Sequence, residues 1–76
     1  MPSFQRQLDQ ARLDLTEAQH RIEIQTVLIG QLRSDGYPTA SAEQLLVLYL
    51  ELREKLTLHL ERLEREAEER SSSASK

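Results

Sequence analysis

The chemistry that this chain could perform depends first on Glu17-x-x-His20. Carboxylate di-iron sites in helical bundles use this Glu-x-x-His spacing, because helical positions i and i+3 project together. Both residues fall on the outer side of the helix expected around them. The matching carboxylates, Glu51 and Glu54, fall on the outer side of a second expected helix. A metal site would therefore need a second subunit, and we favour a solvated Glu–His pair without a metal.

His20 also permits a second interpretation. The segment His20-Arg21-Ile22, followed by Gln25-Thr26-Val27-Leu28-Ile29, loosely resembles the phospho-acceptor helix of some bacterial sensor kinases. Those kinases also dimerise through a helical hairpin. The 76 residues hold no ATP-binding domain, which excludes autokinase activity. A His20 phosphotransfer hairpin stays open as an alternative to a plain exposed imidazole.

Other catalytic classes lack their residues. The chain has no cysteine, which excludes a disulfide scaffold, a zinc knuckle and a thiol nucleophile. It shows no Ser/His/Asp set, glycine-rich phosphate loop or pair of buried carboxylates. A net charge of −3, with signs that alternate along the chain, makes a poor ligand for nucleic acid. We therefore expect no enzymatic activity, no cofactor and no nucleic-acid partner.

The distribution of apolar residues gives an expectation about the compartment. No apolar run approaches the ~18 residues that a membrane span needs. The first residues lack the basic region and the long apolar core of a signal peptide. We therefore expect a cytoplasmic protein with no membrane partner.

Periodicity predicts an all-α chain. In the first half, apolar residues follow a 4-3 heptad spacing with one polar interruption, at Gln25. In the second half, the same spacing passes through Tyr49 and is interrupted only at His59. We predict helices over about 4–34 and 40–69, joined by a turn at 35–39. The predicted rows are Phe4, Leu8, Ala11, Leu15, Ala18, Ile22, Gln25, Ile29 and Leu32, then Ala42, Leu45, Tyr49, Leu52, Leu56, His59 and Leu63.

The segments at the helix ends agree with a single hairpin domain over residues 1–70. Ser3 is placed to cap the first helix, and Gly36 suits the left-handed residue just past its end. Thr39 is the expected cap of the second helix, with Ser41 and Gln44 as a competing capping box. A turn this short makes the helices antiparallel neighbours. The serine-rich segment 71–76 is predicted to be disordered.

The two rows can be placed in register about the turn. This register sets Ile29 against Leu45, Gln25 against Tyr49, and Leu15 against His59. The Tyr49 hydroxyl would then satisfy the Gln25 amide, and such a buried polar pair would fix the register. Protonation of a buried His59 would be penalised, which predicts weaker assembly below about pH 6.

Apolar residues exceed what one hairpin seam can cover. Fourteen of the 76 residues are leucine, and residues 45–50 are apolar on every face of their helix. An exposed patch of this kind marks an interface, and a symmetric dimer forming a four-helix bundle would cover it. Higher oligomers remain open. The predicted interface residues are Ile24, Val27, Leu28, Leu46, Val47, Leu48 and Leu50.

Part of the chain resembles a known type of protein. The turn and cap Asp35-Gly36-x-x-Thr39-Ala40-x-Ala42-Glu43, preceded by Leu28-Ile29-x-x-Leu32 and continuing to Leu58-His59, resembles small helical-hairpin proteins of alphaproteobacteria, notably of rhizobial relatives. The likeness covers roughly residues 15–63. This chain is richer in leucine after Leu46 than that pattern. The resemblance implies a helical hairpin and no particular activity.

The sequence thus favours a structural, adaptor or regulatory protein that acts through self-association and protein contacts. One alternative is a small regulator that docks on a helical partner, such as the dimerisation hairpin of a sensor kinase. The other is the His20 phosphotransfer hairpin.

Overall fold

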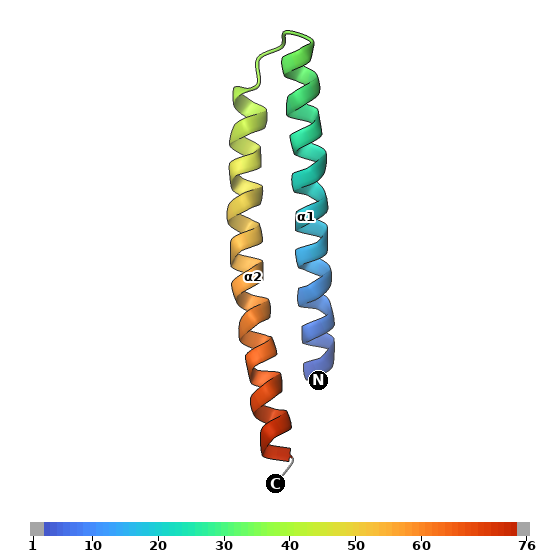
Figure 1. The fold of residues 1–76 in the computed structure, drawn as a ribbon, viewed down its shortest axis with the longest axis vertical. Helices are drawn as coiled ribbons and strands as arrows, with labels where there is room; N and C mark the ends of the chain where they lie inside the picture. The colour runs from blue at the N-terminus through green and yellow to red at the C-terminus, as the bar shows by residue number, and fades with distance from the viewer. Residues whose placement is uncertain (1–2, 75–76) are drawn as a thin grey trace.

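The structure, a computed structural model, describes residues 3–74 and has two antiparallel helices in this range. The helices are α1 (Phe4–Ser34) and α2 (Ala40–Ala74). They lie side by side along their lengths, so that both ends of the chain lie away from the turn (Figure 1). The hairpin is a rod of 63 × 18 × 16 Å. This arrangement confirms the all-helical hairpin.

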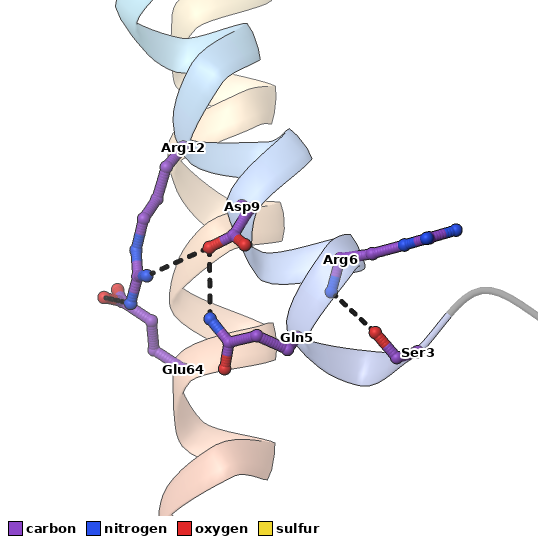
Figure 2. Close-up of polar contacts among 6 residues, drawn as sticks. All are labelled: Ser3, Gln5, Arg6, Asp9, Arg12 and Glu64. Carbon is purple, nitrogen blue, oxygen red and sulfur yellow. Dashed lines mark hydrogen bonds and ion pairs between the residues drawn. The ribbon is translucent and has the colours of Figure 1, made fainter.

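Local hydrogen bonds explain where α1 begins and ends. The Ser3 hydroxyl accepts a hydrogen bond from the Arg6 backbone N–H at 3.2 Å, which caps the first turn (Figure 2). At the other end, Gly36 adopts a φ of 79°. The Tyr37 N–H then donates to the Leu32 carbonyl at 2.9 Å, and the Gly36 N–H donates to the Arg33 carbonyl at 3.1 Å. These two bonds form a Schellman motif, which needs a residue that tolerates positive φ.

The second helix begins and ends differently. The Thr39 carbonyl accepts the Glu43 N–H at 2.8 Å, which places Thr39 at the N-cap position and sets aside the Ser41 alternative. The prediction of disorder from residue 71 is wrong for the first part of that segment, because α2 continues to Ala74. Serine is a tolerable helix residue, and neither glycine nor proline follows Arg70 to end the helix. Residues 75–76 lie outside the described range.

The core is one narrow row from each helix. Leu8, Ala11, Ala18, Gln25 and Ile29 are buried on α1, which confirms the predicted row of the first helix. Leu63 of α2 packs with Leu8 and Ala11, and partly buried side chains close this cluster: Phe4, Leu60 and Ala67. The Arg70 guanidinium lies over the Phe4 ring, 4.1 Å from its centroid, and covers the end of the core.

The predicted row of the second helix is confirmed at Ala42, Tyr49, Leu56 and Leu63, and it is wrong at the three positions that alternate with them. Leu45 and Leu52 are 39% and 45% exposed, and His59 is exposed as well. The less exposed row of α2 runs instead through Ala42, Leu46, Tyr49, Leu56, Leu60, Leu63 and Ala67. This row brings Leu60 inward where the predicted row would bring His59, and it continues to Ala67, beyond the end of the predicted row at Leu63. Because burying polar or charged groups costs free energy, the observed row is preferred.

Two further predictions depended on the predicted register of the two helices. Gln25 is buried as expected, but its Nε2 donates to the Ala42 carbonyl of α2 at 2.9 Å rather than meeting the Tyr49 hydroxyl. His59 is exposed in the single hairpin rather than buried in its seam, and the expected weakening of assembly below about pH 6 stays a prediction. In the described part of the chain, no buried side-chain polar atom lacks a hydrogen-bond partner.

Candidate functional site

The largest unexplained feature of the hairpin is the amount of apolar side chain that it leaves exposed. Of the described residues, only three large aliphatic ones are buried, Leu8, Ile29 and Leu63, and none is completely buried. Among the residues whose burial the structure describes, eleven large hydrophobic ones are exposed: Leu13, Ile24, Val27, Leu28, Tyr37, Leu45, Val47, Leu48, Leu50, Leu52 and Leu58. A surface with so much apolar area is typical of an interaction site.

Four of these residues lie together on one side of the hairpin: Leu28, Leu45, Leu48 and Leu52. A depression of about 290 Å³ is lined by both Arg21 of α1 and Leu52 of α2, so these two residues lie level on the same side. Leu28 follows Arg21 by seven residues, and Leu45 precedes Leu52 by seven. Since seven residues make about two helical turns, Leu28 lies on the same side of α1 as Arg21, and Leu45 lies on the same side of α2 as Leu52. Both leucines are nearer than those residues to the loop that joins the helices. Leu48 lies between Leu45 and Leu52 on α2.

We call Leu28, Leu45, Leu48 and Leu52 the leucine flank. Their exposed fractions are 40%, 39%, 59% and 45%, so each is in contact with its own hairpin but far from covered. Ile24, 54% exposed, lies one turn before Leu28 on the outer edge of this flank.

The opposite side of the hairpin carries its cross-helix ion pairs. Arg33 Nη2 lies 2.8 Å from Glu43 Oε1, and Arg12 Nη2 lies 3.9 Å from Glu64 Oε2 (Figure 2 shows the second pair). Arg12 and Arg33 are separated by whole seven-residue repeats, as are Glu43 and Glu64, so both pairs lie on one side. Arg33 and Glu43 lie two positions from the rows of Leu28 and Leu45, which is about 200° around each helix. Two ion pairs with partly exposed side chains therefore bridge the helices on one side, and the four leucines lie on the turn-proximal half of the other.

The predicted interface residues do not form a single face. Leu28 and Leu48 belong to the leucine flank, whereas Leu46 is half-buried in the seam and Leu50 lies in the row of Glu43 on the ion-pair side. The others lie on the outer surfaces of their helices: Ile24, Val27 and Val47. Leu45 and Leu52 were missed because the sequence pattern assigned them to the seam.

The residues considered for chemistry lie apart from this flank or do not converge. His20 is exposed on the outer side of α1, where it lines a shallow depression with Thr16, Glu17 and Arg21. His59 lies beside Asp14 at a different depression. Within residues 3–74, no group of three His, Cys, Asp or Glu side chains is close enough to hold a metal ion. The arrangement brings no catalytic set together.

Comparison with known proteins adds no relative. No family model, no curated protein and no solved structure matches the chain. The resemblance to alphaproteobacterial hairpin proteins therefore stays a prediction. Among the described residues, neither helix is long and apolar enough to cross a membrane.

Proposed function

We propose that this chain is a non-enzymatic protein that acts by self-association, in which two hairpins join through their leucine flanks into a four-helix bundle. The observation that carries this proposal is the asymmetry of the two sides: ion pairs bridge the helices on one side, and four half-exposed leucines line the other. Hairpins of this kind are stable when a second pair of helices covers their apolar side.

The energetics support the same conclusion. Full burial of one leucine contributes about 1.5–3 kcal/mol, and these four are roughly half-covered in the single hairpin. Covering them therefore contributes on the order of 1 kcal/mol each in each subunit. A chain of 76 residues with so small a core gains a large fraction of its total stability from such a contact.

Two matched substitutions test the proposal. Leu48 and Leu58 are on the same helix and are exposed to similar extents, 59% and 53%, but Leu58 lies on the outer side with Val47 and Thr57. Leu48→Glu places a charge in the proposed interface, so we expect light scattering to show the mass of a single chain. Leu58→Glu leaves the interface intact, so we expect its mass to equal that of the unmodified protein.

The same pair of variants shows what would refute the proposal. Unchanged mass in Leu48→Glu, or equal loss of mass in both variants, would contradict a role for the leucine flank. Because the separated hairpin has a small core, circular dichroism of both variants accompanies the mass measurement. Loss of helix in Leu48→Glu alone, recovered at higher protein concentration, is expected if association through this flank stabilises the fold.

A further inference from the structure

The leucine flank covers only the half of the hairpin nearest the turn, and the same side continues as a charged surface. On α1 it carries Asp14 and Glu17, and at the same level on α2 it carries Lys55 and His59. Residues that line the same surface depression lie at the same height along the hairpin. Glu17 lines one depression with Leu52 and Leu56, and Asp14 lines another with His59. No ion pair of the described residues includes Glu17 or Lys55. Asp14 and Glu17 of α1 thus lie level with His59 and Lys55 of α2, and Arg21 of α1, level with Leu52, lies at the border with the leucine flank.

In one possible dimer, the two hairpins overlap along their whole length and their turns lie at opposite ends. The two contacting surfaces then do not match. The leucine-rich half of each subunit would lie against the charged half of the other. In that arrangement each helix lies on the same helix of the partner, so Leu28 would be buried against the polar half of α1 and Leu48 against the half of α2 that carries Lys55 and His59, at a cost in desolvation. The distribution of residues along the hairpin disfavours this arrangement.

An opposite-end arrangement with partial overlap brings the leucines together but covers too little area. The 31 residues of α1 make a helix of about 46 Å, so a side that is 18 Å wide presents about 830 Å². Overlap of the turn-proximal halves alone covers about 400 Å² per subunit, whereas stable interfaces bury about 800 Å² per partner.

We propose that the second copy lies with its turn at the same end, so that α1 of each subunit packs on α2 of the other. This inference rests on the proposed self-association and specifies its geometry. Leu28 then meets the partner's Leu45 and the partner's Leu48. Glu17 faces the partner's Lys55, and Asp14 faces the partner's His59. The whole side is covered, and every neighbouring pair of helices in the bundle is antiparallel.

Distances between paired spin labels test this geometry. The chain has no native cysteine, so Tyr37→Cys in the turn and Glu68→Cys near the far end of α2 each accept a single nitroxide. Tyr37 lies in the turn, and Glu68 follows Val47 by three seven-residue repeats and so lies on the outer surface of α2, which keeps both labels outside the proposed interface. In the same-end dimer both variants should give intermolecular distances of about 30 Å or less, because the labels are separated only by the width of the bundle.

The opposite-end arrangements give a different pattern. At 1.5 Å per residue, full overlap places the two Tyr37→Cys labels about 60 Å apart, and partial overlap places the two Glu68→Cys labels about 60 Å apart. A distance near 60 Å in either variant would overturn the same-end geometry and leave self-association standing. Absence of any intermolecular distance in both variants would overturn self-association itself, and the geometry with it.

Discussion

The buried side chain of Gln25 on α1 donates a hydrogen bond to the backbone carbonyl of Ala42 on α2, across a distance of 2.9 Å. Gln25 interrupts an otherwise apolar row, and its bond reaches the first turn of the neighbouring helix. Since a buried amide without a partner costs free energy, this bond favours the one register that supplies Ala42 at that level.

Two substitutions of Gln25 separate the contribution of its hydrogen bond to stability from the contribution of the volume that its side chain fills. Gln25→Ala removes both, and we expect it to lower the free energy of unfolding by about 1–2 kcal/mol. Gln25→Leu keeps most of the volume, so it should cost less than Gln25→Ala. Urea unfolding at one fixed protein concentration measures both, because dimer stability depends on concentration. Equal stability of Gln25→Ala and the unmodified protein would contradict a role for the bond.

Gly36 should be intolerant of a side chain. A Cβ on Gly36 would meet nothing within 4 Å, so the cost comes from its φ of 79° alone. Gly36→Ala is therefore expected to destabilise the hairpin by about 1 kcal/mol. Thermal unfolding would show this as a midpoint several degrees lower. An unchanged midpoint would show that the turn has another conformation in solution.

Gly30 should respond to the same substitution with the opposite sign. It lies inside α1, and a Cβ there would also meet nothing within 4 Å. Alanine is a better helix former than glycine, so Gly30→Ala should raise the free energy of unfolding by up to about 1 kcal/mol. Gly30 lies two positions after Leu28 and away from the leucine flank, so the mass in solution should stay unchanged. A change in mass would place Gly30 in an interface that the proposal does not include.

His20 provides a test of the phosphotransfer alternative. We expect His20→Ala to leave helix content and mass unchanged, because the imidazole is exposed on the outer side of α1. We also expect no phosphorylated chain after incubation with an acyl-phosphate donor. A phosphorylated product in the unmodified protein that is missing in His20→Ala would instead favour the phosphotransfer hairpin.

Much of the fold could be predicted because its signals are local. Ser3 caps α1 through its own hydroxyl, and Gly36 supplies the positive φ that ends it. The row of α1 was recognisable because polar residues surround it. Each of these features depends only on neighbours within a few residues.

The row of α2 could be predicted at Ala42, Tyr49, Leu56 and Leu63, but not at the positions between them, because residues 45–50 are apolar in every direction. Leu45 and Leu46 fit a heptad row equally well, and the choice depends on distant positions. The observed row brings Leu60 and Ala67 inward and leaves His59 outside. This difference also hid the leucine flank, since Leu45 and Leu52 appeared to belong to the core.

The mass of the unmodified protein in solution tests the central claim most directly. Sedimentation equilibrium at micromolar concentrations should give about twice the chain mass of 8.8 kDa. A helical protein that stays at the mass of one chain throughout that range would contradict self-association. The leucine flank would then be free for a helix of another protein.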